Sequence, residues 1–296
     1  MLYFFGELPT GLVFAMLALG IYISLRILNV PDLTTEGSFG VGVILGSIAG
    51  MTLNPLAAIP VALIAGAAAG LVTGVLQTKL NIHPVLAGII TMNIFYSINL
   101  LLIHIGSAAF AGVKSTNIYM SGNTIFSKAA SMLNINLNSA QGTWLKLIIL
   151  FAFTVIVSGI LIWFFSTNLG LAIRATGNNP DMVRASSINV IRTKIIGLCI
   201  SNSLVAMSGA MLAQLQGFAD FGSATGTLIR GLAAVILGGA IFKYRNIPVG
   251  VISAIAGAVI YQLLVAVVVR YQIFGVNSSD LKSLTIAAIM AIVLAL

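Results

Sequence analysis

The stretch GLAIRATGNNPDMVRASSINV, residues 170–190, is the most polar long segment of a chain that is otherwise almost entirely apolar. Of the 296 residues, 59% are hydrophobic and 7% are charged, and the mean hydropathy is +1.11. Soluble domains carry about 25% charged residues. On both sides of the stretch, apolar runs of about 20 residues, the length that crosses a bilayer, alternate with short polar breaks. We therefore expect one polytopic membrane domain, residues 1–296.

Apolar periodicity and helix breakers predict an all-α fold, a transmembrane bundle of about 8–9 membrane helices. The last predicted helix is short, and the loop at about 107–142 is too polar to span the membrane. The helices are expected near residues 8–28, 36–53, 56–78, 85–106, 143–166, 195–216, 225–241, 247–269 and 282–296.

Basic residues indicate how the bundle is oriented. Alternating the helices places eight Lys and Arg residues on the side of residues 170–190 and five on the opposite side. Because cytoplasmic loops carry an excess of basic residues, we expect that stretch in the cytoplasm and the N-terminus outside. Orientation in a bacterial cytoplasmic (inner) membrane also explains the formal net charge of +8, so we expect lipid rather than nucleic acid around the chain.

The central polar loop, about residues 167–194, contains signals for a short helix. Asn179 can cap a helix start, Pro180 suits the first helical position, and Asp181 places negative charge at the positive end of the helix dipole. A helix over residues 180–187 would be about 12 Å long, too short to cross the membrane. We therefore expect it outside the bilayer.

This helix would present apolar side chains within a basic surround. A capped helix of this kind is typical of a segment that docks into a groove on another protein, and the alternative is a basic loop that only sets topology. The apolar side chains are Met182, Val183, Ala185 and Ile188, and the basic ones are Arg174, Arg184, Arg192 and Lys194.

A polar cluster opens the second predicted helix. Asp32 and Glu36 flank Thr34 and Thr35, and Ser38 follows between glycines. Charges at this position are informative, because an unpaired charge in hydrocarbon costs at least about 2.5 kcal/mol. One interpretation is a helix cap at Asp32, followed by tight packing at the glycines. Alternatively, the cluster can be a broken helix that offers backbone donors and hydroxyls to a passing solute, as discontinuous transporter helices do.

Further polar residues lie along the apolar runs. Asn93 in the fourth helix can contact either a substrate or a neighbouring helix, and the latter is the commoner role. The segment QGFADFGSATGTLIRG, residues 216–231, places Asp220 and Arg230 ten residues apart, where they can pair across a re-entrant mouth. We hypothesise a gate there. Glycines at 66, 70 and 74 form a stripe that favours close helix contact.

Together, residues 170–190 and PDLTTEGSFG at residues 31–40 resemble the permease subunits of ABC importers in the branched-chain amino acid, ribose and nucleoside group, above all the tryptophan/tyrosine permease subfamily. The resemblance extends over nearly the whole chain in length and helix order. It implies that the short helix is a coupling helix, seated in a groove of a separate ATP-binding subunit. The implied coupling residues are Arg174, Asn178, Asn179, Pro180, Asp181, Met182, Arg184 and Ile188.

The resemblance also implies partners and a solute. The partners would be ATP-binding cassette ATPase subunits, an external substrate-binding (lipo)protein and a second permease copy, and the solute a small one, an amino acid and in particular an aromatic one. The chain has no G-x-x-x-x-G-K-[ST] phosphate loop, so ATP and Mg would bind the partner, with no cofactor on this chain and no enzymatic activity of its own.

Two other functional classes compete with this one. The first is an ion-gradient-driven secondary transporter with Glu36 or Asp220 as the coupled carboxylate, which would leave the capped cytoplasmic helix unexplained. The second, an intramembrane enzyme, lacks a recognisable Ser/His/Asp arrangement, H-E-x-x-H pair or carboxylate dyad. Two histidines without a nearby carboxylate arrangement make no recognisable metal site.

Overall fold

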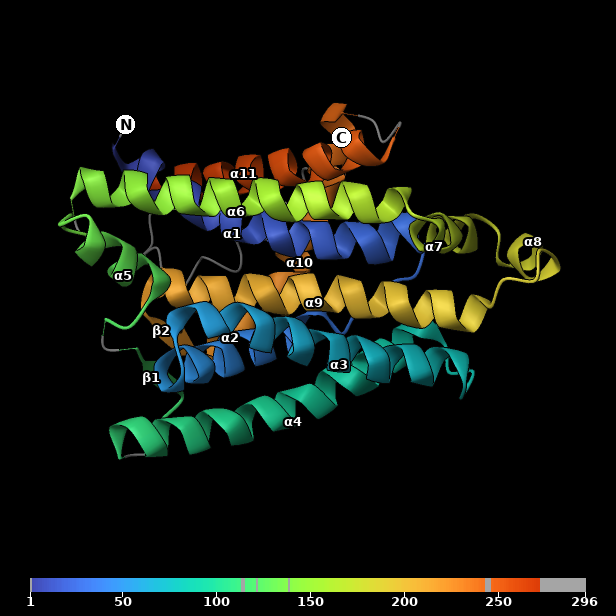
Figure 1. The fold of residues 1–296 in the computed structure, drawn as a ribbon, viewed down its shortest axis with the longest axis horizontal. Coiled ribbons are helices and arrows are strands. Elements are labelled where there is room, and N and C mark those ends of the chain that lie inside the picture. The colour runs from blue at the N-terminus through green and yellow to red at the C-terminus, as the bar shows by residue number, and fades with distance from the viewer. Residues whose placement is uncertain (1, 113–114, 121, 138, 243–245, 272–296) are drawn as a thin grey trace.

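The computed structural model describes residues 2–112, 115–120, 122–137, 139–242 and 246–271 as a bundle of long helices (Figure 1). In these residues, three short α-helices, three short π or 3-10 turns and a two-stranded ribbon connect the long helices. The long helices are α1 (Leu2–Tyr22), α2 (Thr35–Thr52), α3 (Ala58–Thr78), α4 (Pro84–Ala111), α6 (Ala140–Ser166), α9 (Val190–Gln216), α10 (Thr227–Phe242) and α11 (Ile247–Tyr271).

These helices confirm the predicted all-α membrane bundle. Seven described helical stretches are long and apolar enough to cross a membrane, and α2, with 18 residues, corresponds to the remaining predicted span before residue 270. The expected helix at 282–296 lies outside the described residues. Three starts were predicted too late: α1 already begins at Leu2, and α6 and α9 are capped earlier than expected by the side chains of Ser139 and Asn189.

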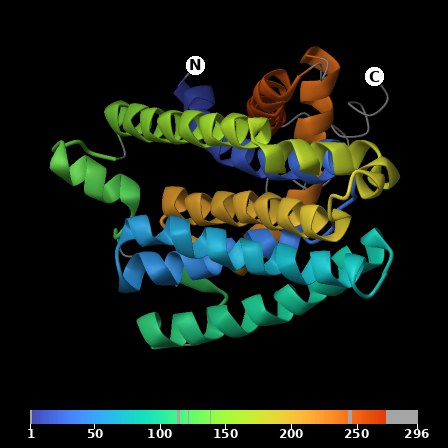
Figure 2. The ribbon, with the colours of Figure 1, turned by 45° about the vertical axis from the view of Figure 1, so that its right-hand side comes forward.

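Helix α9 is the centre of the bundle, with α1, α2 and α3 packed around it (Figure 2). Small residues allow this. A Cβ added at Gly66 or Gly70 of α3 would lie 2.3 Å from a backbone oxygen of α9, and one at Gly42 of α2 would lie 1.9 Å from the Ala206 oxygen. Only glycine permits such backbone contact, so the predicted contact through the glycine stripe of α3 is confirmed.

Helix α2 begins inside the bundle rather than at its surface. Ser38, in its first turns, bonds Asn202 near the middle of α9, whereas Gly50 approaches Gln214 close to the end of α9. The two helices therefore run parallel, and α2 covers only the second half of α9. The chain reaches this start from α1 through a π-helical turn, η1 (Ile23–Ile27), and an irregular segment at 28–34.

Helix α10 also starts within the bundle and runs in the opposite direction from α2. The 3-10 turn η3 (Phe221–Ala224) enters from the end of the bundle and brings Ala224 close to Gly40 of α2. Directly after it, the Gly226 backbone N–H donates to Glu36 of α2 at 2.9 Å. The irregular segment 216–231 is therefore re-entrant, as predicted, although it contains a helical turn and a strand.

Several short elements were missed by the sequence analysis. Strands β1 (Asn117–Tyr119) and β2 (Phe218–Asp220) pair antiparallel and join two loops about a hundred residues apart. The region 167–179, expected to be a loop, contains helix α7 (Asn168–Asn178), and α8 (Pro180–Ala185) follows it. Helix α5 (Ile125–Met132) lies at the opposite end of the bundle from α7 and α8 (Figure 1).

Candidate functional site

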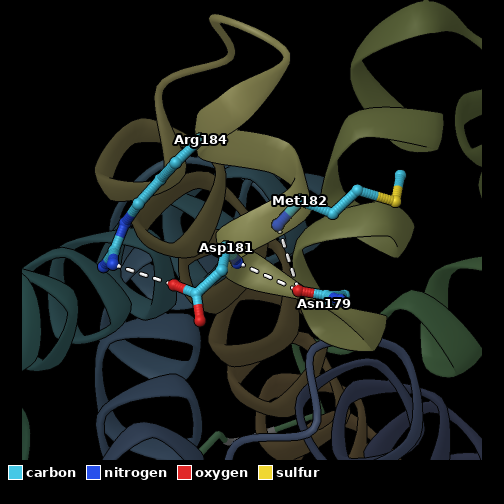
Figure 3. Close-up of polar contacts among 4 residues, drawn as sticks. All are labelled: Asn179, Asp181, Met182 and Arg184. Carbon is cyan, nitrogen blue, oxygen red and sulfur yellow. Dashed lines mark hydrogen bonds and ion pairs between the residues drawn. The ribbon is translucent and has the colours of Figure 1, made fainter.

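Helix α8 projects from the end of the bundle and is held by the predicted cap (Figure 1). The Asn179 side-chain oxygen accepts hydrogen bonds from the backbone N–H groups of Asp181 at 3.1 Å and Met182 at 3.0 Å (Figure 3). Arg184 forms an ion pair with Asp181 at 3.1 Å, three residues back on the same short helix. Pro180 occupies the first turn, as expected, and the helix ends at Ala185, two residues earlier than predicted.

Fewer of the apolar side chains of α8 are exposed than the sequence indicated. Met182 is 59% exposed and Ile188, just after the helix, is 38% exposed, so both are available to a partner. Val183 is only 1% exposed and cannot serve as a docking side chain, which corrects the predicted apolar surface. The Val183 carbonyl accepts the N–H of Ile188, which folds the chain back behind the helix.

Helix α7 fixes α8 to the bundle. A Cβ at Gly177 would lie 1.9 Å from the Ile27 oxygen, so α7 packs backbone to backbone against η1, the turn that follows α1. The hydroxyls of Thr176 and Thr193 lie 2.9 Å apart, which joins α7 to the first turn of α9. Helix α7 therefore connects α8 to η1 and to the central helix through short, buried contacts.

Two of the predicted coupling residues, Arg174 and Asn178, line a basic cavity of about 330 Å³ next to the bundle. Arg174 and Asn178 come from α7, and Arg26 comes from η1. The predicted coupling residues are thus divided: Arg174 and Asn178 border the bundle, whereas Asp181, Met182, Arg184 and Ile188 lie on or beside the projecting helix.

The polar cluster before α2 is a buried hydrogen-bonded network. Asp32, 7% exposed, accepts the Asn202 amide at 2.7 Å and the Thr34 backbone N–H at 2.9 Å. Asn202 in turn accepts the Ser38 hydroxyl at 2.6 Å, and the Thr34 hydroxyl lies 2.7 Å from that of Thr73. These groups bind one another rather than open space, which favours the packing interpretation for most of the cluster.

Glu36 points in a different direction from this network and lines a cavity of about 300 Å³ between α2, α4 and η3. Asn93 and Tyr96 of α4 line the same cavity, and the Tyr96 ring packs edge to face on Phe221 at 5.0 Å between centroids. Tyr96 is 56% exposed and the exposed Asn93 bonds its own helix, so this face of α4 is both polar and uncovered in a single chain.

Asp220 and Arg230 do not form the predicted ion pair, although the structure describes both residues. The Asp220 side chain instead accepts the Gly222 N–H, and the Arg230 guanidinium lies 5.4 Å from the centre of the Phe14 ring. Both residues nevertheless line one cavity of about 390 Å³, separate from that of Glu36.

Three aromatic residues of these cavities were missed: Tyr96, Phe14 and Tyr261. In an apolar helix an aromatic residue resembles any lipid-facing or core residue, so only the tertiary contacts identify it. Among the residues the structure describes, no group of three or more His, Cys, Asp or Glu side chains is placed to hold a metal ion.

Comparison with known proteins identifies the family of this chain. The family model of the branched-chain amino acid transport system / permease component matches residues 4–294. The tyrosine transport system permease protein of Clostridioides difficile (strain R20291) is 33% identical over 285 residues, covering 95% of this chain and 87% of that protein. The ribose import permease RbsC of Escherichia coli (strain K12) is 28% identical, covering 67% of this chain and 57% of that protein.

Solved structures agree at the level of the fold. PsaBC from Streptococcus pneumoniae matches with a TM-score of 0.51 and 14% identity, covering 98% of this chain and 89% of that one. A putative metal-chelate type ABC transporter in an inward-facing conformation matches with a TM-score of 0.53 and 17% identity, covering 99% and 84%. The chain belongs to the branched-chain amino acid transport system / permease component family and is a multi-pass ABC transporter permease of the inner membrane.

Proposed function

We propose that this permease imports an amino acid, and in particular an aromatic one, by ATP-driven alternating access. The observation that carries the proposal is the cavity between α2, α4 and η3, in which Glu36 and Asn93 face the aromatic pair of Tyr96 and Phe221. An aromatic solute finds there both a ring partner and hydrogen-bonding groups. The 33% identity to a protein named as a tyrosine permease supports the same solute class.

The uncovered face of α4 supports a dimeric path. Asn93 and Tyr96 are exposed in the single chain, and polar side chains in a membrane face the bundle interior or a water-filled cavity rather than lipid. A second copy of this chain, packed against that face, would enclose the cavity. An external substrate-binding (lipo)protein would deliver the solute at the end that carries β1, β2 and α5.

Helix α8 would couple ATP binding on the partner to the conformation of the permease. ATP and Mg²⁺ bind a separate cassette ATPase, and α8 docks into its groove through Met182, Arg184 and Ile188, while Asn179 and Asp181 keep the helix formed. ATP-bound and ATP-free ATPase dimers hold different separations of the two α8 helices, so nucleotide binding shifts the permease between two conformations. Helix α7 and the start of α9 transmit this movement to the central helix.

The test is co-purification from native membranes of tagged wild-type protein beside Arg184→Glu, with mass spectrometry for an ATPase subunit. Arg184 is exposed and paired only within α8, so the charge reversal should leave the fold intact and remove the ATPase. In proteoliposomes containing both subunits and the binding protein, uptake of L-tyrosine should require ATP. Retention of the ATPase by the variant would contradict the coupling role of α8, and uptake driven by an ion gradient alone would favour a secondary transporter.

A further inference from the structure

The cavity lined by Asp220 and Arg230 is not used by the proposed transport path. It has a volume of about 390 Å³ and lies within one chain, between α1, α9, α10 and α11. A volume of this size is in the range of small-molecule sites. The segment 220–230 separates it from the cavity of Glu36, since Phe221 and Ala224 line one cavity and Ser223 and Arg230 line the other.

Arg230 supplies to this cavity a positive charge that has no direct ion-pair partner among the described residues. No carboxylate lies within 4 Å of its guanidinium among the described residues, and the Glu36 carboxylate of the other cavity interacts with it only at longer range. The guanidinium lies close to the face of the Phe14 ring. This contact stabilises the positive charge, but the ring offers no hydrogen-bond acceptor to the N–H groups of Arg230. A cation at this depth in a membrane protein is costly without an anion, and it marks a ligand site by default.

Tyr261 of α11 adds a second donor without an acceptor. Its side chain is 2% exposed, and its hydroxyl has no hydrogen-bond partner in the described structure. An unsatisfied buried hydroxyl costs about 1–3 kcal/mol, so such groups usually have a partner that occupies the adjacent space. A carboxylate is the group that accepts both from an arginine fork and from a phenol.

Negative charge lines the same cavity. Glu7 of α1 accepts one hydrogen bond from Gln262 at 2.9 Å, and Asp220 accepts the Gly222 N–H and the Asn117 amide on one oxygen, so each carboxylate keeps free lone pairs. An ammonium group is the cation that could use them. A cavity that presents Arg230 and Tyr261 to an anion, and Glu7 and Asp220 to a cation, is complementary to a zwitterion.

We propose that this cavity, lined by Glu7, Phe14, Asp220, Arg230 and Tyr261, is a second binding site for a free α-amino acid within each permease subunit. The Arg230 guanidinium and the Tyr261 hydroxyl bind its carboxylate, and Glu7 and Asp220 bind its ammonium group. The site goes beyond the proposed function, because it is formed by one chain and its ligand class follows from its charges rather than from the transported solute. The bound amino acid and Glu36 of the first cavity would then both interact electrostatically with Arg230.

The test is equilibrium binding to the purified permease in nanodiscs, without ATPase or binding protein. Radiolabelled L-tyrosine and L-leucine should each be tested, with tyramine and 3-(4-hydroxyphenyl)propionate as competitors that lack the carboxylate or the ammonium group. We expect saturable binding of at least one amino acid and at least tenfold weaker competition by either analogue. Tyr261→Phe, which removes only the hydroxyl, should weaken binding about tenfold.

Tyr119→Phe is the matched control, since it removes the same hydroxyl from an exposed tyrosine that lines neither cavity and should leave the affinity unchanged. Absence of saturable binding of both amino acids to folded wild-type protein would overturn the inference. Binding weakened by Tyr96→Phe but not by Tyr261→Phe would also overturn it, because the amino acid would then occupy the proposed transport path. Binding lost in Tyr261→Phe, with no ATP-driven amino acid uptake by the full transporter, would support the second site and contradict the transport proposal alone.

Discussion

Replacing Met182 by alanine tests directly whether α8 is the contact with the ATPase. Met182 is 59% exposed on a helix that projects from the bundle. Complete burial of a methionine side chain is worth about 1.5–3 kcal/mol. If the exposed 59% becomes buried in a groove of the partner, Met182→Ala should cost about 0.9–1.8 kcal/mol of binding free energy, about a 5- to 20-fold increase in Kd.

The assay is surface-immobilised permease in nanodiscs titrated with purified ATPase, with thermal unfolding measured in parallel. Because the side chain is already in solvent, the unfolding temperature should not change. Met132→Ala is the matched control: Met132 is 81% exposed on α5, at the opposite end of the bundle, and its loss should leave the Kd unchanged. An unchanged Kd for Met182→Ala, or an equal loss for Met132→Ala, would refute the assignment of α8 as the docking helix.

Three further predictions concern the supports of the site. Asn179→Ala should destabilise α8 by about 1 kcal/mol and speed hydrogen exchange of the two amides it caps. Asn202→Ala should destabilise the protein by about 2–3 kcal/mol in thermal unfolding, because it leaves the buried Asp32 carboxylate without its amide donor, and adding Asp32→Asn should restore part of the loss; an unchanged midpoint would contradict the network. Gly42→Ala should cost about 1–3 kcal/mol by displacing α2 from α9, whereas Gly159→Ala, with no heavy atom within 4 Å, should cost nothing.

The sequence predicted the bundle well because a bilayer imposes a simple constraint. Every span must be about 20 apolar residues of helix, so composition and breakers locate spans without knowledge of their neighbours. The cap of α8 was equally predictable, since Asn179, Pro180 and Asp181 act on backbone groups one to three residues away. Helix α7 was missed because its polar sequence resembles a loop, and what holds it is contact with the distant Ile27.

The candidate site was predicted less completely. The sequence identified Asp32, Glu36 and Ser38 as one cluster, but the structure turns Asp32 and Ser38 toward Asn202 and turns Glu36 toward Gly226. Asp220 and Arg230 were expected to pair because they are opposite charges on one segment. They line one cavity without an ion pair, since the path of the chain through β2 and η3 determines where each side chain reaches.

The sequence by itself determined the membrane location, the number and rough bounds of the long helices before residue 270, and the capped helix beyond the bilayer, because each depends on hydropathy or hydrogen bonds between near neighbours in the chain. Only the tertiary structure decided that α2 and α10 begin inside the bundle, that the polar residues divide between two cavities, and that Val183 is buried while Met182 is exposed. These features depend on contacts between residues far apart in sequence, which helix periodicity does not encode.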